Sequence, residues 1–429
     1  MKVSKKLAKV NANEQLIIAF DVSKDKLDLY TEYGQGVVTS IEDSFANQSP
    51  LIETKLDELA ALAATNGFNG LHIVCEATAS YELKLMKTAR RLGHTTAYVS
   101  GESVSKFKVV ESNDTGKTDR KDPRIIFLLA KNGKVLTYRE LQGEYLLLRE
   151  WNRIYDVQET AKISLKAHIH FLLQRLFCDY SFKKDFPYQA TGRGLMELYG
   201  FNPYRIVEAG FERFSEQMRQ RVNTIRRQTL QRLWRDAESS VLHQLPREYA
   251  ALMEKHLRLA WEEYLLRENR MKEAKEQMIK LYQRLRDRGE VVPQPQPDVI
   301  TAFRIARLLG ETGPLRDFIH YRVLWRYAGL NLRERKSGKY LGKIRLSKKG
   351  RSPIRNVACQ AIFGLLRRGH LYGDFYHRKK AAGMPGTKAM VVVIRKFLKM
   401  FWALGQPAKC FDQQRVFICE SQYRLKMAA

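Results

Sequence analysis

The sequence has few cysteines and no long apolar run. Its five cysteines are scattered without a Cys-x-x-Cys pair, so we expect neither a structural zinc site nor a disulfide framework. Because no run of about 18 apolar residues occurs, no membrane span is expected. The basic N-terminus lacks the apolar segment of a secretory signal. These absences predict a reduced, cytoplasmic protein with no membrane partner.

Acidic residues are also scarce relative to basic ones. The chain has 46 Asp and Glu against 75 Lys and Arg, which gives a net charge of +29. Such an excess is typical of a protein that binds a polyanion, most often nucleic acid. A generally basic soluble protein, or a ribosome-associated one, is the alternative. With 429 residues, 44% of them hydrophobic, the chain can form two or three folded domains.

A phosphate-cradling P-loop is missing as well. Gly116, Lys117 and Thr118 resemble the end of such a loop, but the glycine required five positions earlier is replaced by Glu111. Nucleotide binding of that type is therefore excluded.

After a basic tail at 1–13, residues 14–140 alternate strand-like and helix-like segments. A hairpin of strands followed by alternating helix and strand predicts a mixed sheet with helices on both faces, as in an RNase H/RuvC-like α/β domain. The expected strands are 16–20, 26–30, 37–40, 71–75 and 96–99, and the expected helices are 50–65, 81–92 and 104–110.

The remainder of the chain reads as mainly helical. In a segment at 141–290, apolar residues recur every seven positions, which predicts a long coiled-coil-like arm. This arm either serves dimerisation or nucleic-acid binding, or is an internal antiparallel helix pair. A proline-rich linker at 291–298 precedes a mainly α domain at 299–405 and a tail at 406–429. The apolar repeat consists of Leu257, Tyr264, Met271, Met278 and Leu285.

Four carboxylates stand at positions that suit a metal site. Asp21 and Glu76 each follow an apolar strand, whereas Asp119 and Asp122 lie three residues apart at the start of a helix running to about Lys131. Residues so spaced share a helix face. Gathered carboxylates repel one another unless a cation neutralises them, and hard oxygen ligands favour Mg²⁺ or Mn²⁺. The sequence therefore predicts a divalent-metal site.

A second candidate site surrounds Ser337. Its stretch holds one acid, Glu334, among many bases, a composition that suits contacts to nucleic-acid phosphates. A serine is a poor nucleophile unless a base or metal activates it. Ser347 is the competing candidate for the nucleophile, but we interpret it as a turn or N-cap-like residue before the Lys-Lys-Gly stretch. The predicted nucleic-acid-binding residues are Arg333, Arg335, Lys336, Lys339, Lys343, Arg345, Lys348, Lys349, Arg351 and Arg355, with Lys117, Arg120 and Lys121 beside the acids.

Several stretches resemble the DEDD transposases, a family of bridge-RNA-guided insertion-sequence recombinases related to pilin-gene invertases. Residues 21–28 (DVSKDKLD), 76–81 (EATASY) and 117–122 (KTDRKD) match its three N-terminal signatures. Residues 328–330 (AGL), 337–339 (SGK), 347–350 (SKKG) and 354–355 (IR) match its C-terminal transposase domain. Ala79 and Pro123 depart from the usual glycine and alanine.

The resemblance implies specific roles. The four acids would bind metal in a RuvC-like domain, and Ser337 would attack DNA to form a covalent phosphoserine link. The active site would join the acids of one subunit to the serine of another, in a dimer or tetramer. A structured bridge RNA would pair with donor and target DNA, in bacterial cytoplasm at the nucleoid.

We therefore predict an RNA-guided, Mg²⁺-dependent DNA recombinase. One alternative is a RuvC-like nuclease that uses water, with Ser337 as scaffold. Another is a non-catalytic nucleic-acid-binding scaffold. An actin-like kinase or ATPase lacks the necessary glycine-rich phosphate loops and leaves the net charge unexplained.

Overall fold

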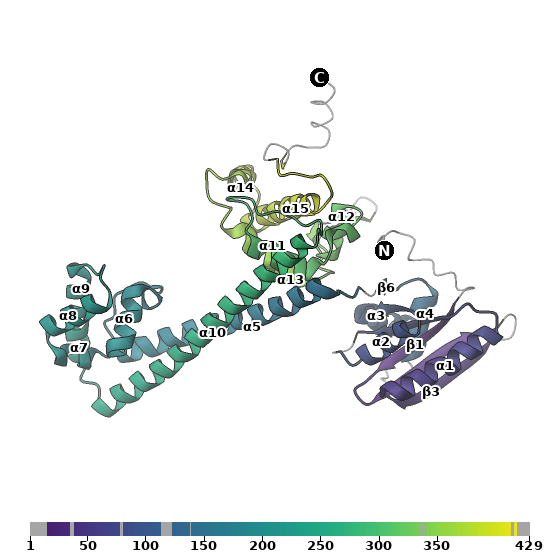
Figure 1. The fold of residues 1–429 in the computed structure, drawn as a ribbon, viewed down its shortest axis with the longest axis horizontal. Coiled ribbons are helices and arrows are strands. Elements are labelled where there is room, and N and C mark those ends of the chain that lie inside the picture. The colour runs from purple at the N-terminus through teal and green to yellow at the C-terminus, as the bar shows by residue number, and fades with distance from the viewer. Residues whose placement is uncertain are drawn as a thin grey trace, which may run out of the picture. The chain divides into compact units, whose positions relative to one another are not determined.

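The computed structural model describes residues 15–34, 38–77, 80–112, 122–137, 139–334, 336–337, 340–342, 344–412 and 416–417 (Figure 1). The chain divides into two units, which we describe separately. The first contains residues 1–141 and 317–323, and the second contains residues 142–316 and 324–429.

The first unit is built on a mixed six-stranded sheet in the order β3-β2-β1-β4-β5-β6. Strands β1, β2 and β3 form an antiparallel meander, β4 and β5 run parallel to β1, and the short β6 is antiparallel to β5. The strands are β1 (Leu16–Val22), β2 (Lys26–Tyr33), β3 (Thr39–Ala46), β4 (Leu71–Glu76), β5 (Thr95–Val99) and β6 (Leu136–Thr137).

Helices cover both faces of this sheet. Because side chains alternate along a strand, Ile18 and Phe20 of β1 face a core with α1 (Ser49–Thr65) and α2 (Leu83–Arg91). Ile17 and Ala19 face the opposite core, with α3 (Gly101–Ser112) and α4 (Asp122–Lys131). The α/β prediction is confirmed, and β3 extends beyond its predicted end.

The second unit contains a long pair of helices, α5 (Gly143–Leu176) and α10 (Arg247–Asp287), which lie side by side (Figure 1). The predicted seam of α10 is largely buried inside the chain, with Leu257, Tyr264, Met278 and Leu285 among its buried residues. Of the two alternatives for this segment, the structure therefore shows the internal helix pair, formed by α5 and α10. The part of the chain that connects α5 to α10 forms five short helices: η3 (Phe186–Tyr188), α6 (Ala190–Tyr199), α7 (Pro203–Ala209), α8 (Phe211–Arg221) and α9 (Arg227–Val241).

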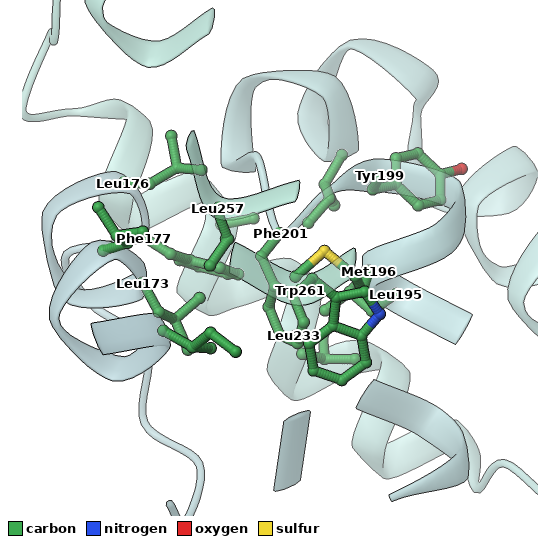
Figure 2. Packing of buried hydrophobic residues seen from close by; sticks show 14 of the residues in the cluster. Leu173, Leu176, Phe177, Leu195, Met196, Tyr199, Phe201, Leu233, Leu257 and Trp261 are labelled. Atoms are coloured by element: carbon green, nitrogen blue, oxygen red, sulfur yellow. The ribbon is translucent and has the colours of Figure 1, made fainter. Parts of the chain in front are cut away.

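An aromatic-rich core joins these short helices to the long pair (Figure 2). Trp261 of α10 stacks on Tyr188 with ring centroids 5.7 Å apart, and Leu195 and Met196 of α6 belong to the same buried cluster. Large buried side chains of this kind dominate the stability of a helical core.

The C-terminal region is mainly helical, as predicted. A helix not anticipated from the sequence is α14, whereas the basic stretch around Ser337 contains four two-residue strands. The helices are α11 (Ala302–Thr312), η4 (Leu315–Asp317), α12 (Tyr321–Tyr327), α13 (Ser352–Phe363), α14 (Leu371–Ala381) and α15 (Gly386–Leu404). The strands are β7 (Leu332–Arg333), β8 (Lys336–Ser337), β9 (Tyr340–Leu341) and β10 (Arg345–Leu346).

Among the described residues, no helix is both long enough and apolar enough to cross a bilayer.

Candidate active site

Two of the predicted acids stand at the carboxyl ends of adjacent parallel strands. The register pairs Phe20 of β1 with Cys75 of β4, so the next residues along the two strands are Asp21 and Glu76. Asp21 has the same parity along β1 as Ile17 and Ala19, and therefore the side chain is directed to the face that α3 and α4 cover. Along β4, Glu76 has the same parity as Val74, which belongs to the same core as Ile17 and Ala19, so Glu76 lies on that face as well.

The third acid, Asp122, is the first residue of α4 and enters the same site. Burial raises the pKa of the Glu76 carboxyl, and the nearby charges of Asp21 and Asp122 raise it further, against the opposing effect of Lys108. Lys108 of α3 forms an ion pair with Asp122. The structure thus brings Asp21, Glu76 and Asp122 within electrostatic reach of one another, with the partly exposed ammonium group of Lys108 beside Asp122.

Gly101, the first residue of α3, lies directly against Glu76. A Cβ atom at Gly101 would lie 2.3 Å from Glu76 Oε1 and 3.2 Å from its Cδ. Only glycine allows the carboxylate to occupy this position. Neither Gly101 nor Lys108 was singled out from the sequence, because each gains its role only from the way α3 packs.

The chemistry of these side chains fits a divalent cation. Carboxylate oxygens are the ligands that Mg²⁺ prefers. The pKa of Glu76 is raised first by burial and then by the charges of Asp21 and Asp122, and a cation would relieve this repulsion between the carboxylates. Among the described residues, no group of three His, Cys, Asp or Glu side chains is close enough to hold a metal ion as it stands. Asp119 lies outside the described residues, as do Lys117, Arg120 and Lys121.

Ser337 lies in a nested hairpin. The outer pair is β7 with β10, and the inner pair is β8 with β9, in which Ser337 is opposite Tyr340. Only the backbone of Lys336 and Ser337 is described, and Arg335, Lys339 and Lys343 lie outside the described residues.

The base of this hairpin is fixed by backbone contacts. Ser347 N–H donates to Asn331 O at 2.8 Å, and Lys348 N–H donates to Gly329 O at 3.0 Å. The Ser347 Oγ accepts a hydrogen bond of 3.2 Å from the Lys349 N–H, and Lys348 has a positive φ of 55°. Ser347 thus occupies a turn.

The predicted phosphate contacts fall into two groups. Arg333, Arg345, Lys348 and Lys349 are exposed and can meet a polyanion. Two arginines of the predicted set are bound to the protein itself: Arg351 to Glu311 and Arg355 to the backbone. Arg351 Nε donates to a Glu311 oxygen at 2.6 Å, and Arg355 donates to Ala328 O at 2.8 Å.

The strand order, with acids at the ends of β1 and β4 and at the start of α4, defines the first unit as a RuvC-like domain. Residues 18–178 match a family model described as "Transposase", and residues 299–377 match one described as "Transposase IS116/IS110/IS902 family". The two matches together cover more than half of the chain. The chain therefore belongs to the IS110 family of transposases, enzymes that act on DNA.

Other comparisons add little to this assignment. No curated protein matches the chain significantly. Among solved structures, the chain is similar to the RuvC protein of Thermus thermophilus at 10% identity and a TM-score of 0.21, over 28% of this chain and 98% of that one. At this level the likeness carries no weight, and the assignment rests on the family matches and the strand order.

Proposed function

We propose that this transposase cuts and rejoins DNA through a covalent link to Ser337, assisted by a divalent metal held by the acids of its RuvC-like domain. The observation that carries the proposal is the convergence of Asp21, Glu76 and Asp122 on one face of the sheet. The resemblance of residues 337–339 to the family's serine motif supports the choice of nucleophile.

The acids would hold Mg²⁺ or Mn²⁺, with Asp119 as the fourth ligand. Bound there, the metal would supply positive charge against the scissile phosphate. In the protein itself, Gly101 makes room for the Glu76 carboxylate and Lys108 pairs with Asp122. Both residues hold the acids in place for a cation.

The covalent step conserves the energy of the phosphodiester bond. Ser337 Oγ loses its proton and bonds to phosphorus, while the bond from phosphorus to the leaving sugar oxygen breaks and that oxygen takes up a proton. In rejoining, a sugar hydroxyl of another strand attacks the same phosphorus and releases the serine. No water is consumed and no redox partner is needed.

The partners follow from charge and from the family resemblance. A net charge of +29 suits binding to donor and target DNA and to a structured bridge RNA that pairs with both. The exposed Arg333, Arg345, Lys348 and Lys349 are the described residues best placed to contact phosphates. A homo-oligomer, dimer or tetramer, would combine the acids of one subunit with Ser337 of another.

A suicide-substrate experiment tests the proposal. Protein with its co-purifying RNA, Mg²⁺ and nicked labelled DNA is analysed on a denaturing gel. We expect a DNA-linked protein band that is lost in Ser337→Ala, in Asp21→Asn and after RNase treatment. Ser347→Ala is the matched control and should retain the band.

The alternatives give different products. Cleaved DNA without linked protein, unchanged in Ser337→Ala, would show a hydrolytic nuclease. Binding without any cleavage, unchanged in Asp21→Asn, would show a scaffold. Retention of the linked band after RNase treatment would refute only the RNA dependence.

A further inference from the structure

A buried polar cluster joins the long helix α5 to α11. Glu311 is buried near the end of α11, and Asn152 of α5 is fully buried opposite it. Asn152 Nδ2 donates to Glu311 Oε1 at 2.7 Å, and Arg307 Nε donates to Asn152 Oδ1 at 2.7 Å. Burying such groups is costly unless their hydrogen bonds are satisfied, so a satisfied cluster fixes one geometry.

The backbones of α5 and α11 also approach closely at this point. A Cβ atom at Gly310 would lie 2.9 Å from the carbonyl carbon and oxygen of Leu148. Arg149 donates to the carbonyl oxygens of Gly310 and Glu311, both at 3.0 Å. These carbonyls belong to the last turn of α11, which has no intrahelical donors for them. Arg149 of α5 therefore caps α11.

The other oxygen of Glu311 faces the segment that ends the serine hairpin. Arg351 Nε donates to Glu311 Oε2 at 2.6 Å, and Arg351 N–H donates to Tyr327 O at 2.8 Å. At the neighbouring Gly350, a Cβ atom would lie 2.5 Å from both Tyr327 O and Gly329 N. Residues 347–351 are thus held between Glu311 and the backbone of residues 327–331.

One carboxylate therefore connects two elements far apart in the sequence. Its first oxygen is fixed by α5, and its second fixes Arg351 at the base of β10 and β7. A charge-assisted hydrogen bond from a guanidinium is short, directional and about twice as strong as a neutral one. Rotation of the Glu311 carboxylate would weaken both contacts at once.

We propose that Asn152, Glu311 and Arg351 form a positioning relay through which α5 sets the orientation of the hairpin that carries Ser337. They are positioning residues, since the contacts that define the relay are with one another. The part of this inference that concerns strand transfer rests on the proposed role of Ser337, whereas the mechanical link from α5 to the hairpin does not. The relay makes the order of the hairpin depend on the position of the long helix.

Backbone amide hydrogen exchange of the full chain, without DNA, tests the mechanical link. In Glu311→Gln the amides of Ser347, Lys348 and Arg351 should exchange at least about 10-fold faster, because local opening of the hairpin base becomes easier. Asn152→Ala removes the side-chain contacts of Asn152 with Glu311 and Arg307 and leaves Glu311 itself in place. It should change the exchange in the same direction, and it replaces Glu311→Gln as the test if that variant fails to fold.

Glu268→Gln is the matched control. Glu268 of α10 also pairs with two cations, Lys162 at 3.0 Å and Arg193 at 2.8 Å, neither of which belongs to the hairpin segment. It should perturb the long helix pair and leave the three hairpin amides unchanged. If those amides are equally protected in wild type, Glu311→Gln and Asn152→Ala, the relay does not exist.

The chemical consequence is measured separately. In Glu311→Gln and Asn152→Ala the rate of covalent adduct formation should fall about 10- to 100-fold, as expected for a displaced nucleophile. DNA affinity should be unchanged, a separation that general unfolding would not produce. An unchanged adduct rate would overturn the positioning role. If the wild type forms no adduct at all, the proposed function fails while the exchange result still decides the mechanical link.

Discussion

The substitution Gly101→Ala tests the geometry of the acidic site with one added methyl group. The new Cβ would lie 2.3 Å from Glu76 Oε1. Carbon and oxygen atoms in ordinary contact are about 3.4 Å apart or more, so the carboxylate oxygen must move by about 1 Å. The atom that must yield is the end of a flexible side chain, and the backbone of α3 can stay in place.

The substitution should therefore affect the rate of cleavage much more than the stability of the fold. A shift of about 1 Å at a catalytic group costs about 100-fold in rate, equivalent to about 2.7 kcal/mol of transition-state stabilisation. The free energy of unfolding should change by less than about 1 kcal/mol, since alanine is a better helix former than glycine.

Single-turnover cleavage of labelled DNA over a range of Mg²⁺ concentrations measures the first effect, and thermal unfolding measures the second. Gly364→Ala is the control, because an added Cβ there meets nothing within 4 Å. A folded Gly101→Ala protein with unchanged cleavage would refute the placement of Glu76 in the site.

Three further predictions concern other parts of the chain. Because its folded pKa is raised, Glu76 contributes stability below its ordinary pKa and loses it as the pH rises through the raised value. Glu76→Gln should therefore raise the Tm in EDTA at neutral pH and not in acid; a lowered neutral Tm would contradict this. Trp261→Ala should cost about 3–5 kcal/mol in urea unfolding, and a loss below that range would show that Trp261 is not a central part of its core. Lys348→Ala and Lys349→Ala should each reduce the slope of log K against log salt for DNA binding by about one, and unchanged slopes would show that these lysines do not contact phosphates.

The sheet of the first unit was predictable because its pattern is local. The predicted apolar runs at 16–20 and 71–75 form most of β1 and β4, and Asp21 and Glu76 lie at the carboxyl ends of these two strands. Parallel pairing of those two strands then brings their ends together. A short apolar run and its following residue were sufficient to place both acids.

Other features depend on contacts that no local pattern encodes. Glu311 pairs with Asn152, which is 159 positions away, and nothing near either residue signals the pairing. The composition of the basic run around Ser337 predicts a phosphate-binding surface, yet Arg351 and Arg355 form hydrogen bonds within the protein. Composition gives the amount of charge in a segment and not the direction of each side chain.

The most direct measurement of the central claim is the identity of the residue that carries DNA. The trapped protein–DNA complex would be digested with nuclease and chymotrypsin and analysed by mass spectrometry. Ser337 and Ser347 fall in different peptides, because cleavage after Tyr340 and Leu346 separates them. We predict a nucleotide on the peptide of residues 333–340. A nucleotide on the peptide beginning at Ser347, or on neither, would contradict the assignment of Ser337 as the nucleophile.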